Sequence, residues 1–211
     1  MKKNEKFVIT INREVGSGGR TVGRKLAEKL NVKYYDKALV DGLTEKYGLT
    51  LDQIERLKAE KKSSWWEDFN HLYRSFMGSS SATENEEKPT TASMFETERR
   101  IFEELASQES CVVAGRSTFL IFRDWPNHLN VFIQASIGHR LARIMNRQGV
   151  SMQHAHDIIN ELDEGRETYI KKYSDKSRYD TRNYQLVISM DDLSEEDAVD
   201  VILAYMKGVM K

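Results

Sequence analysis

Four short runs of apolar, mostly β-branched residues place the strongest limit on the fold of this chain. They are FVITI (7–11), CVVAG (111–115), NVFIQA (130–135) and QLVISM (185–190), with VKYY (32–35) as a weaker fifth. The runs are continuous rather than alternating and are bounded by turn residues, which is typical of strands in a parallel sheet covered on both faces. Helical patterns lie between them, so the sequence predicts βαβ units in a three-layer α/β fold.

The helical segments show apolar stripes and starting signals. Val22, Leu26, Ala27 and Leu30 share one face of a predicted helix, and a second stripe lies within 96–106. Serines predict two helix starts, because a serine hydroxyl accepts a hydrogen bond from the first turn: Ser136, and Ser194 with Asp197 in an approximate capping box. Residues 151–173 are predicted to form a long, charged helix interrupted at Gly165.

Composition indicates a soluble globular protein. The 211 residues suffice for one core, or a core with a small lid. The net charge of -1 gives no general attraction to nucleic acid or membranes, and no run approaches the roughly 18 apolar residues of a membrane helix. The single cysteine, Cys111, excludes an internal disulfide, and its apolar neighbours favour a buried thiol over a reactive one. We therefore expect a cytoplasmic protein without nucleic-acid or membrane partners.

The stretch from 61 to 91 interrupts the α/β pattern. Its centre, 78–91, is rich in Ser, Thr and Glu and is predicted to be a mobile loop. Aromatic and apolar residues precede this loop at helix-like spacing: Trp65, Trp66, Phe69, Leu72, Tyr73 and Phe76. They predict either an amphipathic helix docked on the core, or a mobile substrate-binding arm or oligomer contact.

A glycine-rich turn joins the first predicted strand to the first predicted helix. Backbone N–H groups at such a turn have no partner inside the helix, and the helix dipole adds positive potential, so the arrangement binds phosphate. The Walker A pattern G-x-x-x-x-G-K-[ST] is not matched, since Gly19 stands at the lysine position. The predicted phosphate-binding residues are Gly16, Ser17, Gly18, Gly19, Arg20 and Thr21.

The chain resembles the cytidylate-kinase-like family, a divergent branch of the P-loop nucleoside-monophosphate kinases. The resemblance is carried by ITINREVGSGGRTVGRKLAEKL, YYDKALVDGL, ESCVVAGRSTFLIFRDWPNHLNVFIQASIGHRLARIMNRQGVS and GRETYIKKYSD…RNYQLVIS, which leave out mainly 60–95. The stretch NREVGSGG is similar to a loop variant of this family that lacks the lysine. The resemblance implies ATP- and Mg²⁺-dependent phosphoryl transfer to a nucleoside monophosphate, most simply CMP.

Arginines near the loop are the candidates for catalysis, because phosphoryl transfer needs neutralisation of oxygen charge. Arg13, Arg20 and Arg166 are the catalytic candidates. Each of the first two has a structural alternative: Arg13 pairs with Glu14 or Asp36, and Arg20 is a solvated helix residue. Thr21 either contacts phosphate or caps the helix.

The remaining roles come from the resemblance. On the acceptor side stand Asp36, Arg116 and Ser117, although Asp36 also suits a helix N-cap and Arg116 a surface position. Arg143 and Arg147, four residues apart on one helix face, line the donor nucleotide or form a solvated basic face. The lid residues are Arg166, Tyr169 and Lys172.

The predicted organisation is one P-loop kinase-like domain over 1–211. Its core comprises 1–59, 96–150 and 184–211, with an acceptor-side helical insert at 60–95 and a lid-like segment at 151–183. Two departures, Gly19 for the lysine and Ala114 for an acidic residue before Gly115, keep open a catalytically weak nucleotide-binding protein that senses or scaffolds. A helix-rich interaction module is a further alternative, and no oligomeric state is predicted.

Overall fold

The computed structural model describes residues 5–36, 91–115 and 117–209. These residues fall into two compact units, one comprising 5–35 and those from Leu105 on, the other Asp36 and 91–104. The predicted aromatic helix of Trp65–Phe76, the stretch 78–90 and Arg116 lie outside the described residues. Thr91, placed in the mobile loop by the sequence, is the first residue of helix α5 (Thr91–Gln108).

All five predicted strands are present in one sheet of the first unit. Its order is β2-β3-β1-β4-β5, and β1 pairs in parallel with both β3 and β4, as β4 does with β5. The strands are β1 (Val8–Arg13), β2 (Lys33–Asp36), β3 (Cys111–Ala114), β4 (His128–Gln134) and β5 (Leu186–Ser189). Because β1 is central and the chain crosses to either side of it, its carboxyl end is a switch point of the kind where α/β sheets bind ligands.

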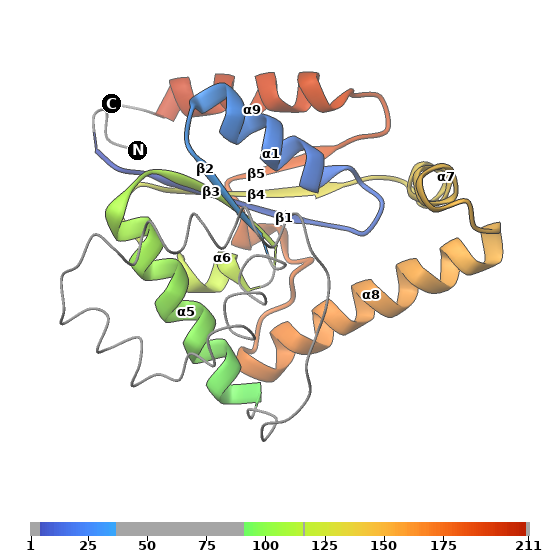
Figure 1. Cartoon of the computed structure of the whole chain (residues 1–211), viewed down its shortest axis with the longest axis horizontal. Helices are drawn as coiled ribbons and strands as arrows, with labels where there is room; N and C mark the ends of the chain where they lie inside the picture. The colour runs from blue at the N-terminus through green and yellow to red at the C-terminus, as the bar shows by residue number, and fades with distance from the viewer. Residues whose placement is uncertain (1–4, 37–90, 116, 210–211) are drawn as a thin grey trace, which may run out of the picture. The chain divides into compact units, whose positions relative to one another are not determined.

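Helices cover both faces of this sheet, as Figure 1 shows, so the three-layer prediction is confirmed. On one face lie α1 (Gly19–Leu30) and α9 (Glu195–Val209), and on the other α6 (Thr118–Ile121) and α8 (Met152–Tyr173). Helix α7 (Ile137–Gln148) follows β4, and the short helix η1 (Thr181–Asn183) precedes β5. Of the described helices, none combines the length with the apolar composition needed to cross a lipid bilayer.

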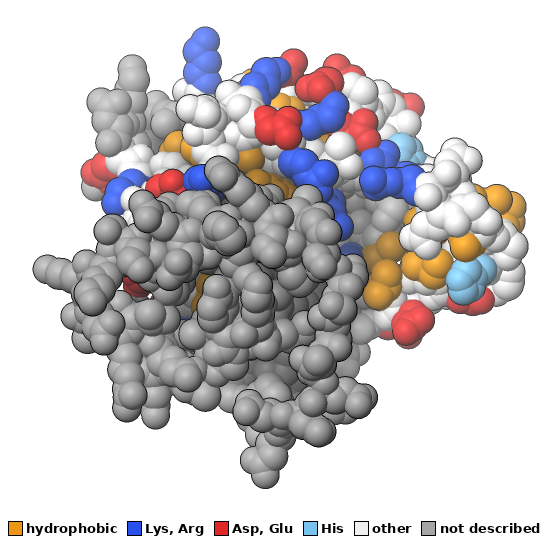
Figure 2. Space-filling view, in the orientation of Figure 1, with side chains coloured by type: hydrophobic (Ala, Val, Ile, Leu, Met, Phe, Trp, Pro, Cys, Tyr) orange, Lys and Arg blue, Asp and Glu red, His pale blue; other side chains and the backbone are white. Residues whose placement is uncertain are grey.

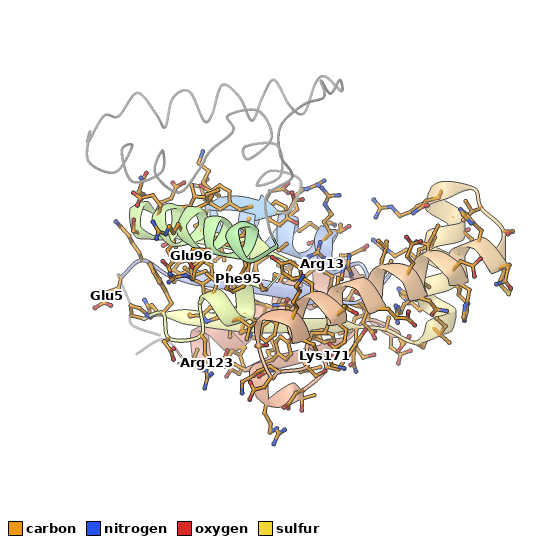
Figure 3. The ribbon with its side chains drawn as sticks, turned by 90° about the horizontal axis from the view of Figure 1, so that it is seen from below. Glu5, Arg13, Phe95, Glu96, Arg123 and Lys171 are labelled. Atoms are coloured by element: carbon orange, nitrogen blue, oxygen red, sulfur yellow. The ribbon has the colours of Figure 1, made fainter. Side chains whose placement is uncertain are left out.

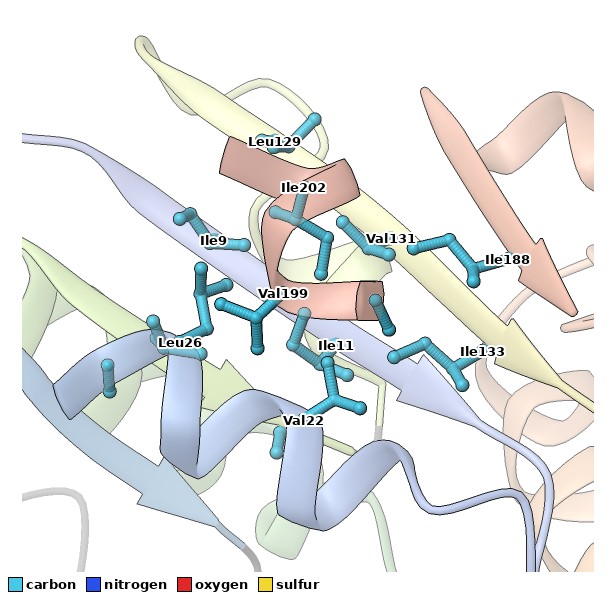
Figure 4. Packing of buried hydrophobic residues seen from close by; sticks show 14 of the residues in the cluster. Ile9, Ile11, Val22, Leu26, Leu129, Val131, Ile133, Ile188, Val199 and Ile202 are labelled. Carbon is cyan, nitrogen blue, oxygen red and sulfur yellow. The ribbon is translucent and has the colours of Figure 1, made fainter. Parts of the chain in front are cut away.

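The main core lies between the sheet and the α1/α9 layer. In Figure 4, Val22 and Leu26 of α1 and Val199 and Ile202 of α9 meet the strand residues. Burying one such side chain contributes about 1.5–3 kcal/mol. The facing aliphatic residues of β1 and β4 are Ile9, Ile11, Leu129, Val131 and Ile133, all at most 1% exposed.

Two further expectations about buried residues hold. Ile101, Phe102 and Leu105 of α5 are buried, as the stripe within 96–106 predicted. Cys111 is also buried, and burial, with the neighbouring Glu109 charge, raises the pKa of its thiol to about 12. The thiol is thus held in the unreactive protonated form.

The outer surface of α1 and α9 carries charges of both signs. Figure 2 shows Lys and Arg side chains interspersed with Asp and Glu over these helices. Two exposed ion pairs link them, Lys25–Glu196 at 2.6 Å and Lys29–Asp200 at 2.5 Å. Such exposed pairs are screened by solvent, so the core rather than these pairs holds the two helices on the sheet.

Serine caps begin three of the helices. Ser136 and Ser151 accept hydrogen bonds from the backbone of His139 and His154, both at 3.3 Å. Ser194 and Asp197 form the predicted capping box, with Asp197 N donating to Ser194 Oγ at 3.2 Å and Ser194 N to Asp197 Oδ2 at 3.0 Å. These contacts satisfy N–H groups that the first helical turn leaves unpaired.

The predicted interruption at Gly165 is wrong, because α8 is continuous from Met152 to Tyr173. A glycine inside a helix costs only about 1 kcal/mol relative to alanine. Ala155, Ile159 and Ile170 are each at most 3% exposed, and their burial outweighs this cost.

Replacing Gly165 with alanine is therefore expected to stabilise the protein by about 0.5–1 kcal/mol, because it reduces the entropy of the unfolded chain. Within the described part of the chain, the added Cβ would meet no atom within 4 Å beyond the local backbone of α8 itself. Urea denaturation followed by circular dichroism checks this. The matched control is Gly16→Ala, where φ is +82° and the Cβ would lie 2.7 Å from the carbonyl oxygen of Arg140, so stability must fall. A destabilised Gly165→Ala variant would contradict a regular helix at this position.

A row of buried and half-buried polar side chains lies on the face of β1 and β4 opposite the aliphatic core. His128 Nε2 and Thr10 Oγ1 are 2.8 Å apart, and Thr10 Oγ1 donates to Asn130 Oδ1 at 2.6 Å. Asn130 Nδ2 in turn donates to the carbonyl of Asn183 at 2.6 Å. Burial lowers the pKa of His128 to about 4, although the carbonyl of Phe122 acts in the opposite direction.

His128 should make folding sensitive to mild acid. Its folded pKa lies below its unfolded value of 6.5, so the unfolded chain takes up the proton first and stability falls as the pH drops from 6.5 towards 4. The loss amounts to roughly 3 kcal/mol. Urea denaturation at pH 7.5 and pH 4 is expected to show this loss in the wild type and in a His154→Gln control, whose exposed ring lies elsewhere, but not in His128→Gln. Equal losses in all three proteins would refute the assignment.

Candidate active site

The turn between β1 and α1 is shaped to receive an anion. Gly16 and Gly18 have φ values of +82° and +86°, which favour glycine. Gly18 is also the N-cap of α1 and supplies no side-chain hydrogen bond, in contrast to the serine caps elsewhere. Among the described residues, the backbone N–H groups of Gly16, Gly18 and Gly19 have no acceptor. Unpaired N–H groups at the start of a helix form a ready-made phosphate site.

Contacts with β4 and α7 hold this turn in place. The buried Ser17 hydroxyl lies 3.0 Å from the carbonyl of Glu14 and 3.1 Å from that of Ile133. The Glu14 carboxylate accepts a hydrogen bond from Ala135 N at 3.1 Å, and Arg140 Nε donates to the carbonyl of Val15 at 2.7 Å. Ser17 thus anchors the turn, since its backbone N–H also donates to the carbonyl of Glu14, at 3.4 Å.

Arg13 ends β1 and passes between two glycines. A Cβ on Gly19 would lie 2.6 Å from Arg13 Cβ, and a Cβ on Gly115 would lie 2.0 Å from Arg13 Nη1. Both positions therefore have to be glycine while Arg13 takes this path. Gly19, which stands at the position of the Walker A lysine, therefore leaves room for the Arg13 side chain because it has no side chain of its own. Figure 3 shows Arg13 beside α8, at the carboxyl end of its strand.

Asp163 of α8 is the centre of a buried charged cluster. It is 7% exposed, and its carboxylate accepts hydrogen bonds from the backbone N of Val15 at 3.1 Å and from the Arg140 guanidinium. Arg178 Nη1 and Arg166 Nη1 donate to the same carboxylate at 3.0 and 3.2 Å. Arg178 and Arg166 (3.3 Å) also donate to the carbonyl of Arg13. One carboxylate therefore connects the glycine turn, α7, α8 and the segment after α8.

Among the described residues, three guanidinium groups share the Asp163 carboxylate, those of Arg140, Arg166 and Arg178, and Arg140 also pairs with Glu14. Burial lowers the pKa of Arg166 to about 10, and the charges of Arg13 and Arg178 act in the same direction against Asp163. An anion placed beside these arginines would relieve their mutual repulsion.

Arg143, which the sequence places on the donor side, lies near the turn. Its Cζ lies 3.3 Å from where a Cβ on Gly18 would be, and its Nη2 donates to Thr21 Oγ1 at 3.3 Å. Arg143 also pairs with Glu195 at 2.7 Å. Thr21 does not cap α1, since Gly18 occupies the N-cap position.

The other predicted site residues lie on different elements of the fold. Arg20 is exposed on the first turn of α1, and Arg147 is exposed in the last turn of α7. Tyr169 packs against the cluster of Phe119, Phe132, Ile170 and Tyr184, while Lys172 is exposed. The structure therefore joins Arg13, Arg166 and Arg143 to the turn, whereas Tyr169 belongs to an aromatic cluster elsewhere in the fold.

The acceptor-side candidates are only partly described. Ser117 follows β3, and its buried hydroxyl is the one buried side-chain polar atom of the described residues that has no hydrogen-bond partner. Asp36 is the last residue of β2 and belongs to the second unit, and Arg116 lies outside the described residues.

Sequence reasoning missed Asp163 and Arg178. Asp163 had a detectable signal, because it stands four residues after Ile159 and seven before Ile170, on the buried face of α8. Arg178 had none, since its guanidinium reaches a carbonyl 165 residues away and lies 5.8 Å from the ring centre of Phe132.

The model of the cytidylate kinase-like family matches residues 8–192. The chain belongs to this family. A curated cytidylate kinase of Sulfurisphaera tokodaii is 25% identical to it over 205 residues, which are 97% of each protein.

Solved structures share the fold of this chain. An uncharacterised protein of Eubacterium ventriosum, 25% identical, superposes with a TM-score of 0.68 over 96% of this chain and 99% of its own. Shikimate kinase of Bacteroides thetaiotaomicron, 17% identical, has a TM-score of 0.52 over 95% and 98% and shows the shared kinase fold. The family supports a kinase that acts on nucleotides.

Proposed function

We propose that this protein transfers the terminal phosphoryl group of ATP to a nucleoside monophosphate, with CMP as the preferred acceptor. The observation that carries the proposal is the meeting of Arg13, Arg166 and Arg178 beside a glycine turn with unpaired N–H groups. Phosphoryl transfer depends on positioning and on neutralising charge on the transferred oxygens, which is what such a cluster supplies.

Arg13 and Arg166 then take over the task of the missing lysine. Because Gly19 has no side chain, the Arg13 side chain can lie against it at the end of β1. Asp163 accepts hydrogen bonds from Arg166 and Arg178 and so holds both near the Arg13 carbonyl. A guanidinium binds phosphate oxygens in a bidentate manner, so it orients the group as well as neutralising it. Arg20, exposed at the start of α1, is the further cation available to the donor phosphates.

The turn fits the phosphates of ATP better than it fits a protein-bound metal. The N–H groups of Gly16, Gly18 and Gly19 are available for phosphate oxygens, and Thr21 and Arg143 stand at the same helix start. Within the described residues no group of three acidic, histidine or cysteine side chains could hold a metal ion. Mg²⁺ commonly keeps several waters and binds through substrate phosphates, so it would be held mainly by ATP itself and would neutralise phosphate charge there.

On the acceptor side, the proposal assigns Ser117 a hydrogen bond to the monophosphate substrate. A buried hydroxyl without a partner costs free energy unless a ligand satisfies it. By family resemblance Asp36 and Arg116 would bind the same acceptor, and Tyr169 and Lys172 would belong to the lid-like segment 151–183.

A coupled assay of ADP release tests the proposal. Purified protein is given ATP, Mg²⁺ and a panel of nucleoside monophosphates, with shikimate and gluconate as acceptors of the wrong class. We expect turnover on nucleotides alone, highest with CMP. ATP binding without turnover on any acceptor would sink the kinase proposal and leave a nucleotide-binding protein. Turnover on shikimate or gluconate would show that the acceptor class is wrong.

A further inference from the structure

A second group of cations surrounds a cavity outside the candidate active site. The cavity has a volume of about 160 Å³ and is lined by residues of α6, the start of β4 and the segment 176–185. Arg123, Lys176 and Arg182 line it, and no carboxylate does. Three cations from two segments of the chain thus line one small space.

These cations are largely unneutralised. Arg182 makes a two-fold hydrogen bond to Asp180, at 2.8 and 2.7 Å, and these bonds lower the pKa of Asp180 to about 2. Within the described residues, neither Arg123 nor Lys176 has a side-chain hydrogen bond or ion pair. Among the described residues, Asp180 is the one carboxylate that forms an ion pair with any of these three cations, so positive charge is in excess and attracts an anion.

Gln185, which directly precedes β5, offers a further donor at the cavity. Gln185 Oε1 accepts from Asn130 N at 2.8 Å, which orients the Gln185 amide. The Gln185 NH₂ group donates no hydrogen bond within the described part of the chain. Asn130 is itself held by Thr10 and Asn183. A fixed amide donor beside guanidinium and ammonium groups suits a tetrahedral oxyanion.

Size and position separate this cavity from the nucleotide site. A cavity of about 150 Å³ holds a benzene-sized molecule, so the space suits phosphate or pyrophosphate but not a nucleotide. His128, at the cavity, lies five residues before Ile133, which contacts the glycine turn, or about 16 Å along β4. Figure 3 shows Arg123 well separated from Arg13.

We propose that the cavity lined by Arg123, Lys176, Arg182 and Gln185 is a second binding site for a small phosphate-type anion. The site does not rest on the proposed kinase activity, because its residues are distinct from those at the glycine turn.

Nuclear magnetic resonance titration of the full chain tests this at constant ionic strength. Inorganic phosphate, pyrophosphate and CMP are added separately, and the amide signals of His128 and Gln185 report the cavity while those of Gly16 and Gly18 report the turn. We expect phosphate or pyrophosphate to shift the His128 and Gln185 signals saturably. Shifts confined to the glycines, or cavity shifts with CMP alone, would overturn the proposal.

A double variant identifies the cations responsible. Arg123→Gln with Lys176→Gln should raise the anion concentration needed for half-maximal shift of the Gln185 signal at least tenfold, with the shift at the glycines unchanged. The charge-matched control removes Lys171 and Lys207, both exposed and outside the lining, by substitution with glutamine. An equal effect in the control would refute specific binding, and thermal unfolding verifies that each variant is folded.

Discussion

Replacing Arg13 with alanine is expected to lower kcat for phosphoryl transfer about a thousandfold while leaving the protein folded. Loss of an arginine that neutralises the transferred phosphoryl group typically costs about 10³–10⁵ in rate. Arg13 ends β1 beside Arg166 and Arg178, in a turn whose lysine position is Gly19. Steady-state kcat and KM, measured with saturating ATP and CMP, check the expectation.

Two comparisons separate catalysis from folding in this experiment. Arg24→Ala removes an exposed arginine of α1 that lies 5.9 Å from the ring centre of Tyr34, and its kcat should stay within twofold of the wild type. Added guanidinium should partly restore the Arg13→Ala rate, because the space between Gly19 and Gly115 is vacated, whereas equal sodium chloride should not. An Arg13→Ala enzyme that keeps more than a tenth of kcat would exclude Arg13 as the substitute for the lysine.

Replacing Asp163 with alanine is expected to destabilise the protein by about 3–5 kcal/mol. Removing one member of a buried charged network leaves the remaining charges uncompensated, and here three guanidiniums lose their shared carboxylate. The backbone N–H of Val15 also loses its acceptor, which loosens the phosphate turn. Urea denaturation followed by circular dichroism gives the free energy of unfolding.

The charge of Asp163, rather than its volume, should account for most of the loss. Asp163→Asn keeps the shape and is expected to lose nearly as much, whereas Glu164→Ala, on the exposed face one residue later, should change stability by no more than about 0.5 kcal/mol. Sulfate should stabilise Asp163→Ala more than the wild type, since the unbalanced arginines attract an anion. A loss below 1 kcal/mol in Asp163→Ala would mean that the arginines are balanced by other groups.

Much of the fold could be predicted because its signals are local. The runs 7–11 and 111–115 contain β-branched residues bounded by turns, and they became the central strands. The caps at Ser136 and Ser194 could also be predicted, because the hydrogen bond of a cap joins residues only three positions apart. The break at Gly165 failed for the opposite reason: burial of distant α8 residues overrides a weak local propensity.

Only part of the candidate site could be predicted from the sequence. The glycine turn and Arg13 stand together at the end of β1, so their joint position follows from chain order. Asp163 is one of several acidic residues of α8, so its residue type did not distinguish it. Arg178 lies in a segment without periodicity. Both act through contacts with residues more than 120 positions earlier, which no local pattern encodes.

By itself, the sequence determined the parallel sheet, the helices on both faces and a glycine-rich turn without the Walker A lysine, since hydrophobic period, caps and glycine spacing act over a few residues. Only the tertiary structure decided where charge gathers around that turn. It brought Arg166 and Arg178 to the Arg13 carbonyl and set Asp163 among them. The physical reason is that a buried carboxylate requires several donors, and these must come from whichever segments the packed core places within reach.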